Sequence, residues 1–321
     1  RVSMRYAFVM AVLGIDAGGT KTVCQVADAT GVILAESRGP GANLQNAGEL
    51  QVEKVLHEVI QAATLQADAW PTSACIGMAG VDRPEDAAIV RGILSRLVPR
   101  CPVVVVNDAL IALEAGAPGA AGVVIIAGTG SIAYGRDDRG RAARAGGWGY
   151  VLGDEGSGYW LGHQALRTVL RASDGRGPAT RLTDRVLAHY DVKRPQDLVR
   201  EIYYGRFKPS TVAAIASLVE EVANEGDEWA LHLIDTGARE LSLAARAVCD
   251  RLELTCGPVI LAGGIFRAVP RLRAGVIESL TSQSAGTIVR PLTQEPAAGA
   301  VSLAIAASEG TFVAPAYVDH D

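Results

Sequence analysis

The chain has 321 residues, a length that suits two domains or one large domain. Its formal net charge of -5 argues against a nucleic-acid partner, because binding to nucleic acid depends on a basic surface. Hydrophobic residues make up 49% of the chain and glycines number 36, which provides a normal soluble core and favours an α/β protein with many tight turns.

The first part of the chain alternates short apolar runs with amphipathic segments. The strands predicted here are residues 12–15, 22–27, 32–37, 74–79 and 103–106. The helices predicted here are residues 49–66, 85–97 and 108–115. The run 103–106 is continuously apolar, as is typical of a strand buried on both faces. The small-residue stretch EAGAPGAAG, residues 114–122, is the best candidate for a linker.

After the linker the layout begins again. A strand at 123–127, a Gly-Thr turn and a strand at 132–135 repeat the order of the opening elements. In both copies a turn glycine follows the threonine eleven residues later, from Thr20 to Gly31 and from Thr129 to Gly140. This similarity suggests two related domains. The later predicted elements are helices at 159–171, 181–189, 196–204, 211–226, 228–251 and 297–308, and strands at 259–262 and 287–290.

The cysteines and the apolar segments indicate the cellular compartment in which we expect the protein. No stretch is long enough to cross a membrane, and the apolar N-terminal residues lack the cleavage site of a signal peptide. The five cysteines form no CxxC pair, and Cys24, Cys75 and Cys101 lie in or beside apolar runs. We therefore expect reduced thiols and a cytoplasmic protein with no membrane partner.

The first glycine turn lies in VLGIDAGGTKTVCQVADATG, residues 12–31. It is not a Walker A loop, because Thr20 stands where that motif needs lysine. As a hairpin it can bind phosphate through N–H groups that glycine leaves accessible, and Asp16 is placed to hold Mg²⁺ through waters. The alternative is a plain hairpin with a surface aspartate. The second turn, Gly128 to Ser131, favours phosphate, because two facing hairpins can clamp a triphosphate.

Asn107 and Asp108 follow the apolar strand 103–106. Ligands of open α/β sheets bind at the carboxyl ends of strands, where an aspartate can orient and deprotonate an attacking hydroxyl. Aspartate is also a favoured N-cap of a helix. Spacing alone leaves both interpretations of Asp108 open.

The stretch GGWGYVLGDEGSGYWLG, residues 146–162, is the richest in candidate contacts. Asp154 and Glu155 can hydrogen-bond sugar hydroxyls, and Trp148 offers a ring face. The alternative is a glycine-rich turn capped by Asp154 or Ser157. Further on, Gly263-Gly264 after the strand 259–262 can let a nucleotide approach the backbone, although this pair alone is a weak signal.

Together these stretches resemble one family. They are, in order, GIDAGGTKT, GMAGVDRPED, VVNDA, IIAGTGSIAYG, GGWGYVLGDEGSGYWLG and LAGGIF. From about Leu13 to the final helix the chain is similar to the N-acetylglucosamine kinase branch of the BadF/BadG/BcrA/BcrD ATPase family, within the actin-like ATPase superfamily. The resemblance implies an α/β fold of two ribonuclease-H-like domains with an interdomain cleft. The expected N-terminal domain is 1–116 with the first hairpin and the general base, and the C-terminal domain is 117–321 with the second hairpin, the nucleotide site and a helical insertion. The final helix is expected to pack back on the N-terminal domain.

The resemblance also implies an activity: ATP-dependent phosphorylation of the 6-hydroxyl of an amino sugar, with N-acetylglucosamine as the expected acceptor. Asp108 is then the general base and Asp16 the residue associated with Mg²⁺. The residues expected at ATP are Gly18, Gly19, Thr20, Lys21, Gly128, Thr129, Gly130, Gly263, Gly264 and Arg267. The residues expected at the sugar are Asn43, Asp108, Ser131, Gly147, Trp148, Gly149 and Asp154. The expected partners are a small amino sugar and ATP, and we expect a homodimer.

Two positions depart from the animal enzyme of this branch. Gln45 stands where that enzyme has a tryptophan lining the sugar site, and Ile132 replaces an asparagine that touches the sugar. Because both positions discriminate the 2-acetamido group and the hydroxyls, glucosamine, N-acetylmuramic acid and glucose remain alternative acceptors.

Two alternative functions use features of the same sequence. A regulatory ATPase would use the same cleft as a nucleotide switch and transfer phosphate only to water; Asp154 beside Trp148 favours the kinase. Another branch of the family bridges a dimer with an iron–sulfur cluster held by paired cysteines. Cys249 and Cys256 lie around a predicted helix end without the cysteine-plus-glycine helix start of that branch, so no cluster is expected.

Overall fold

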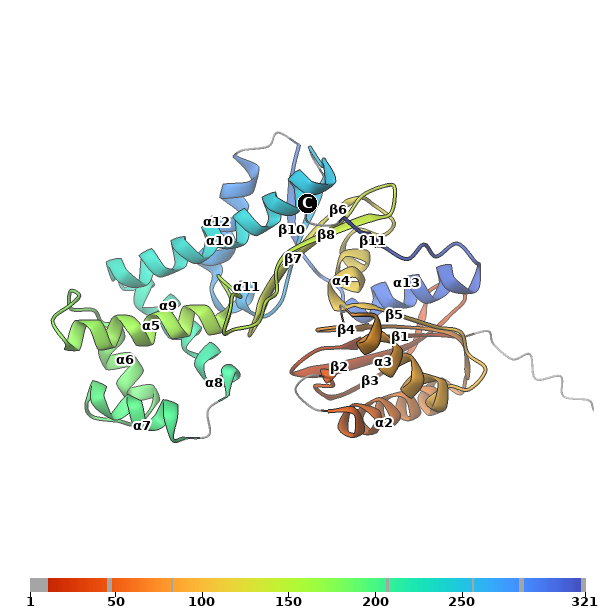
Figure 1. Ribbon diagram of the computed structural model, residues 1–321, viewed down its shortest axis with the longest axis horizontal. Helices are drawn as coiled ribbons and strands as arrows, with labels where there is room; N and C mark the ends of the chain where they lie inside the picture. Colours follow the sequence, from red (N-terminus) through yellow and green to blue (C-terminus); the bar gives the residue numbers. More distant parts are fainter. Residues whose placement is uncertain are drawn as a thin grey trace, which may run out of the picture. The chain divides into compact units, whose positions relative to one another are not determined.

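The computed structural model describes residues 11–44, 48–81, 83–205, 208–255, 257–282 and 286–318. The chain divides into two compact units (Figure 1). Unit 1 comprises Arg1–Ala120, Asp138–Gly140 and Leu292–Ala316, and unit 2 comprises Ala121–Asp137, Arg141–Pro291 and Tyr317–Asp321. The segment that carries the last helix, which our sequence interpretation counted with the second domain, therefore lies in unit 1.

Unit 1 is built on a five-stranded sheet in the order β3-β2-β1-β4-β5. The strands are β1 (Ala11–Ala17), β2 (Lys21–Asp28), β3 (Ile33–Pro40), β4 (Pro71–Met78) and β5 (Val103–Asn107). β1 pairs antiparallel with β2 and parallel with β4, and β4 pairs parallel with β5. Every residue of β1 is buried, because helices cover both faces of the sheet.

The helices of unit 1 form two layers around this sheet. They are α2 (Glu49–Ala67), α3 (Pro84–Leu97), α4 (Asp108–Gly116) and α13 (Pro296–Ser308). α2 lies on one face, and α4 and α13 lie on the other (Figure 1). α13 approaches the sheet closely: a Cβ atom on Gly14 of β1 would lie 2.5 Å from the carbonyl oxygen of Ala297. The Ser73 hydroxyl of β4 donates to the carbonyl oxygen of Ala304 at 2.9 Å.

Unit 2 repeats this topology. Its sheet has the order β10-β9-β6-β7-β8-β11. The strands are β6 (Gly122–Ala127), β7 (Ser131–Arg136), β8 (Arg141–Gly146), β9 (Pro258–Ala262), β10 (Ile288–Pro291) and β11 (Ala316–Tyr317). β6 pairs antiparallel with β7 and parallel with β9, as β1 does with β2 and β4. The duplication inferred from the two Gly-Thr turns is thus present in the strand order.

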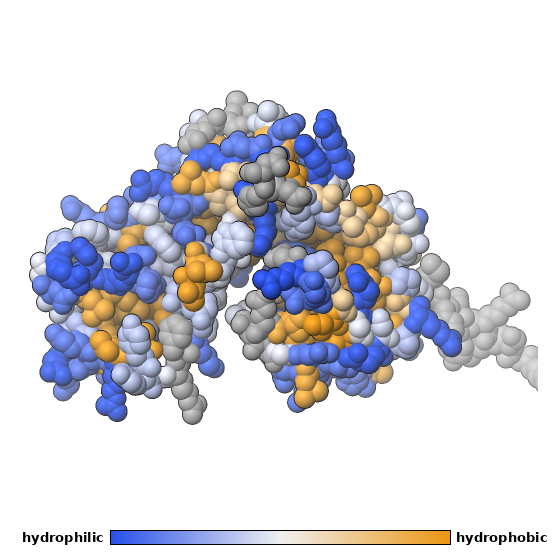
Figure 2. All heavy atoms as spheres, in the orientation of Figure 1, coloured by the Kyte–Doolittle hydropathy of each residue, from blue (hydrophilic) through white to orange (hydrophobic). Residues whose placement is uncertain are grey.

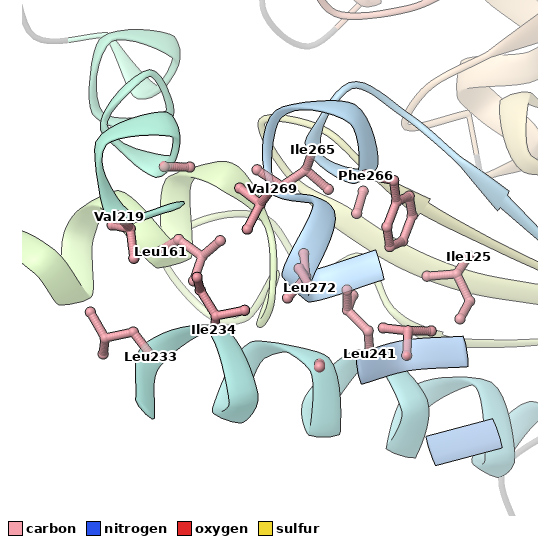
Figure 3. Packing of buried hydrophobic residues seen from close by; sticks show 14 of the residues in the cluster. Ile125, Leu161, Val219, Leu233, Ile234, Leu241, Ile265, Phe266, Val269 and Leu272 are labelled. Carbon is pink, nitrogen blue, oxygen red and sulfur yellow. The ribbon is translucent and has the colours of Figure 1, made fainter. Parts of the chain in front are cut away.

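Helices supply most of the core of unit 2. They are α5 (Gly158–Ser173), α6 (Leu182–His189), α7 (Leu198–Tyr203), α8 (Pro209–Ala213), α9 (Ile215–Asn224), α10 (Glu228–Leu252), α11 (Ile265–Ala268) and α12 (Pro270–Thr281), with a 3₁₀ turn at Pro195–Asp197. In Figure 3, Leu161 of α5, Ile234 and Leu241 of α10 and Leu272 of α12 converge on one cluster. Hydrophilic side chains gather outside it, at the C-terminal end of α5 (Figure 2).

Several predicted elements need correction. β8 was not predicted, because its sequence RAARAG has no β-branched or aromatic residue; pairing with β7 makes it a strand. α12 was also missed. The predicted linker 114–122 was too long, since α4 continues to Gly116. The predicted helix 211–226 is interrupted at Ala214, and the predicted helix 196–204 opens as a 3₁₀ turn. In the described part of the chain, we find no helix with both the length and the apolar character of a membrane span.

Candidate active site

Asp16 and Asp108 lie at the same edge of the unit 1 sheet. Asp16 is the penultimate residue of β1 and pairs with Gly77 of β4, while the next residue of β4, Met78, pairs with Asn107 of β5. Asp108 then begins α4. Because β1, β4 and β5 run parallel, their carboxyl ends meet at one edge, the usual ligand-binding edge of such a sheet.

The environment of Asp16 favours its neutral form. Only 8% of the residue is exposed. Burial, together with the negative charge of Asp108, raises the pKa of Asp16 to about 7; the charge of Glu295 adds to this and that of Lys21 opposes it. Two carboxylates that repel each other in a partly dry site are a donor set that a hard divalent cation stabilises. The residues therefore fit Mg²⁺, which commonly uses one or two carboxylates together with waters and substrate phosphates.

The helix cap at this edge is Asn107. Its side-chain oxygen accepts a hydrogen bond from the backbone N–H of Ala109 at 2.8 Å, and its backbone is extended as an N-cap requires. Asp108 is the first residue inside the helix. The interpretation of Asp108 as the cap was therefore wrong, since the preceding residue fills that role.

The first glycine turn is supported from behind. Gly18 donates its N–H to the carbonyl oxygen of Lys21 at 3.0 Å, and Ala42 donates to the carbonyl oxygen of Gly18 at 3.1 Å. A Cβ atom on Gly41 would collide with the carbonyl oxygen of Gly19. In contrast, a Cβ on Gly19 would meet nothing within 4 Å. The turn thus presents open backbone at Gly19, as a phosphate-binding hairpin requires.

Lys21 and Asn43 lie close to this turn. The Lys21 ammonium pairs with Glu295 at 2.7 Å, and Arg38 pairs with the same carboxylate at 2.9 Å. Burial alone would raise the pKa of Glu295, but Lys21 and Arg38 hold it below its usual range. Asn43 donates from its side chain to the carbonyl oxygen of Ala79 at 3.0 Å, just after β4. Gln45, the first position of departure, lies outside the described residues.

The second glycine turn rests on the start of α5. Gly128 donates to the carbonyl oxygen of Gly130 at 2.9 Å, while Gly158 donates to the carbonyl oxygen of Gly128 at 2.8 Å and Tyr159 to that of Thr129 at 3.2 Å. A Cβ on Gly128 would meet nothing within 4 Å, as at Gly19. The two turns therefore share an open glycine and a rigid support within their own units.

Asp154 is buried against this second turn. It is 6% exposed and has a φ of 61°, and its carboxylate accepts from the N–H of Gly149 at 3.2 Å. Burial raises the pKa of Asp154, against hydrogen bonds from the backbone of Ser131 and Gly149. A Cβ on Gly130 would lie 2.5 Å from the Asp154 carboxylate, so a larger residue there would displace that carboxylate. The cap of α5 is Ser157, whose hydroxyl accepts from the N–H of Trp160.

The rest of the loop is shaped by left-handed glycines. Gly147 has a φ of 70°, and a Cβ there would lie 2.8 Å from the side chain of Ile132, the second position of departure. Gly149 has a φ of 83°. Trp148 is 58% exposed, and the Arg144 guanidinium lies 4.7 Å from its ring centre. One face of this indole is thus occupied by a cation.

The remaining predicted ATP residues follow β9. Gly263 has a φ of 104°, and a Cβ there would collide with the carbonyl oxygen of Ala127 at the end of β6. Gly264 precedes α11, and Arg267 lies in that helix. Unit 2 therefore brings Gly263 and the second turn to one sheet edge, and the loop 147–154 joins them through Asp154.

Sequence reasoning missed three residues of this region. Glu295 holds Lys21 and affects Asp16, Gly41 supports the first turn, and Arg144 stacks on Trp148. Only Arg144 could have been found from the local sequence, because it lies four residues before Trp148. Ser131 was predicted to touch sugar; in the structure its hydroxyl donates to the carbonyl oxygen of Glu155 at 2.8 Å.

Comparison with known proteins agrees with this architecture. The model of the BadF/BadG/BcrA/BcrD ATPase family matches residues 13–304. The N-acetylmuramic acid/N-acetylglucosamine kinase of Clostridium acetobutylicum is 37% identical over 80% of this chain and 86% of its own. The N-acetyl-D-glucosamine kinase of Dictyostelium discoideum is 32% identical over 91% of this chain and 97% of its own.

Solved structures share the fold. A protein of Chromobacterium violaceum assigned as an N-acetylglucosamine kinase superimposes with a TM-score of 0.73 at 26% identity, covering 92% of this chain and 99% of its own. A ROK family glucokinase of Streptomyces griseus reaches a TM-score of 0.56 at 19% identity, covering 92% and 98%. The fold is thus the α/β actin-like ATPase fold, as expected. The chain belongs to the BadF/BadG/BcrA/BcrD ATPase family.

Proposed function

We propose that this chain is an ATP-dependent hexosamine kinase that phosphorylates the 6-hydroxyl of an amino sugar, with N-acetylglucosamine as its main acceptor. The observation that carries the proposal is the pair Asp16 and Asp108 at one sheet edge, in the same unit as a glycine turn with open backbone at Gly19. The two relatives named above, both kinases of N-acetylated amino sugars, support it.

In this mechanism Asp108 accepts the proton of the sugar 6-hydroxyl as the oxygen attacks the γ-phosphorus of ATP. The bond from the γ-phosphorus to the β,γ-bridging oxygen breaks, and ADP leaves. Asp16 would hold Mg²⁺ through waters, and the ion would neutralise charge on the phosphates. The open backbone at Gly19 supplies an N–H donor for phosphate oxygens, and the open space beside Gly128, whose own N–H bonds the carbonyl oxygen of Gly130, leaves room for them.

The proposed sugar contacts are Asp154, the buried residue of the loop 147–154 in unit 2, and Asn43 in unit 1. Asp154 is held by the N–H of Gly149, and its second oxygen lies against Gly130. A carboxylate fixed in this way can accept hydrogen bonds from sugar hydroxyls. N-acetylmuramic acid is the second candidate acceptor, because the kinase of Clostridium acetobutylicum carries both sugars in its name.

The cellular setting follows from the same chemistry. The described cysteines Cys24, Cys75, Cys101 and Cys249 are free, which suits a reducing, ATP-containing compartment such as the cytoplasm. Cys256, the partner considered for an iron–sulfur cluster, lies outside the described residues. The homodimer stays a prediction.

The proposal is tested by ADP release with ATP, Mg²⁺ and a panel of N-acetylglucosamine, N-acetylmuramic acid, glucosamine, N-acetylmannosamine and glucose. We expect release to depend on an N-acetylated amino sugar. The Asp108→Asn variant should lose several orders of magnitude in turnover while still binding the sugar, because only the proton acceptor is removed. If no sugar changes the rate of ADP release, the chain is instead a nucleotide switch. Near-normal turnover of the Asp108→Asn variant would exclude Asp108 as the base.

A further inference from the structure

A groove of about 300 Å³ opens on unit 2 between α5 and α10. We call it the α5–α10 groove. Its lining residues are Trp160, Gln164, Arg167, Thr168, Arg171, Gly177, Pro178, Trp229, His232, Leu233 and Thr236. None of them belongs to the predicted ATP or sugar contacts, so the groove is a separate feature of the unit.

Two helix faces form its walls. On α5 the lining residues run from Trp160 to Arg171 at helical spacing, and on α10 they run from Trp229 to Thr236 in the same way. Both faces are continuous, and Leu233 at the base is buried. The groove is therefore built on two rigid helices, as a preformed ligand site requires.

The lining is basic. Arg167 and Arg171 stand four residues apart on α5, and no carboxylate lines the groove. Arg171 donates to the carbonyl oxygen of Arg176 at 3.1 Å. Across the described residues, the Arg167 guanidinium forms neither a hydrogen bond nor an ion pair. Two guanidinium groups at this spacing repel each other, and an anion bound to both removes that repulsion. The planar donor fork of arginine matches a phosphate group.

The same groove offers ring surfaces. Trp160 and Trp229 are half-buried and line opposite helices. The Trp229 ring also contacts His232 edge-on, with centroids 5.7 Å apart. Indole faces pack well against the C–H face of a sugar ring, and the side chains of Gln164 and His232 can hydrogen-bond hydroxyls. Inorganic phosphate alone would leave these rings without a partner.

We propose that the α5–α10 groove binds a phosphorylated sugar, with the phosphate on Arg167 and Arg171 and the sugar ring between the two tryptophans. The volume of the groove suits a monosaccharide phosphate. In a hexosamine kinase the obvious ligand of this class is the sugar 6-phosphate that the enzyme itself forms.

The groove is connected to the second glycine turn through one helical turn. Trp160 lines the groove, and its own N–H is held by the Ser157 hydroxyl at 3.1 Å. The two residues before it, Gly158 and Tyr159, donate to the carbonyl oxygens of the glycine turn. A ligand that packs on Trp160 therefore contacts the first turn of α5, which holds the second glycine turn. We infer that an occupied groove slows turnover; this step rests on the proposed kinase function, whereas the binding does not.

Binding is measured on the full chain without ATP, by titrating N-acetylglucosamine 6-phosphate and following tryptophan fluorescence and calorimetric stoichiometry. We expect a saturable site that weakens at least tenfold in Arg167→Ala and in Arg171→Ala. Arg91→Ala, an exposed arginine of α3 in unit 1, serves as the matched control and should bind like the wild type. Trp229→Leu should weaken the sugar phosphate but not inorganic phosphate.

Three results would overturn the proposal. Unchanged affinity in both groove arginine variants would place any binding elsewhere. Equal affinity for inorganic phosphate and the sugar phosphate would leave only an anion site, and an equal loss of affinity for N-acetylglucosamine and for the sugar phosphate in Arg167→Ala would remove the role of the arginines as phosphate ligands. Kinase assays then separate the second step: inhibition that is non-competitive with the sugar acceptor and lost in Arg167→Ala supports coupling. A chain that binds through the groove but lacks kinase activity would refute only the proposed function.

Discussion

Asp16 at the end of β1 and Asp108 at the start of α4 interact electrostatically: burial, followed by the negative charge of Asp108, raises the pKa of Asp16 to about 7. In an unfolded chain this carboxyl titrates near 4. Between these two values the folded state holds a proton that the unfolded state has lost. The free energy of unfolding therefore falls as the pH rises through this window.

Metal-free protein should lose stability on the order of 4 kcal/mol between pH 4 and pH 8 through Asp16. Urea unfolding in EDTA at several pH values measures this slope. Asp16→Asn should flatten it, because the amide does not titrate. Mg²⁺ should stabilise the wild type more at pH 8 than at pH 5, since a proton competes with the cation. An equal slope in the variant and the wild type would contradict this role of Asp16.

Asn107→Ala should cost about 1 kcal/mol of unfolding free energy, because the first turn of α4 loses its side-chain cap. Turnover should fall as well, since Asp108 stands in that turn. Asn107→Ser keeps a capping oxygen and should restore most of both. Ser157→Ala removes the cap of α5, and its loss of unfolding free energy serves for comparison. Equal stability of Asn107→Ala and the wild type would show that this cap is dispensable.

Gly19→Ala and Gly128→Ala should leave the melting temperature nearly unchanged, because a Cβ at either position meets no protein atom within 4 Å. Both should raise KM for ATP about tenfold or more, since the methyl group fills the space assigned to phosphate oxygens. Gly92→Ala, in the interior of α3, where a Cβ would meet only the Arg96 side chain at 3.9 Å, should be neutral or stabilising and leave ATP binding intact. Normal ATP kinetics in both turn variants would argue against phosphate binding at these turns.

Glu295→Gln should move the titration of Asp16 to lower pH, because the charge of Glu295 helps to raise the pKa of Asp16. The carboxyl ¹³C shift of Asp16 reports this directly. Stability should change by less than about 1 kcal/mol, since the ion pairs with Lys21 and Arg38 are partly exposed. Glu53→Gln, which breaks the exposed pair with Arg96, is the control and should leave Asp16 unaffected.

Local patterns predicted the edge of the unit 1 sheet well. Asp16 lies at the carboxyl end of one apolar strand and Asp108 directly follows another, and the parallel direction of these strands brings their ends together whatever the rest of the chain does. The apolar spacing of α2 likewise places Val52, Val55 and Leu56 in the core, as expected. These features depend on neighbours within a few residues.

Contacts between distant segments were not predictable in this way. Glu295 and Lys21 are 274 positions apart, and no pattern in the residues around either one indicates that they pair. β8 is made a strand by its partner β7 and not by its own alanines and arginines. The burial of Asp154 also depends on packing against Gly130. The sequence therefore indicated a carboxylate at this position but not that it is buried.

The placement of α13 has a consequence for biosynthesis. Gly14 and Ser73, in strands that are made first, are covered by Val301 and Ala304, which are synthesised much later: Ser73 and Ala304 are 231 positions apart. Until then the sheet of unit 1 exposes an apolar face, whereas nearly all of unit 2 has already been synthesised. The nascent chain should therefore complete its second unit first, and chaperones that hold apolar surfaces should bind mainly to residues 11–116.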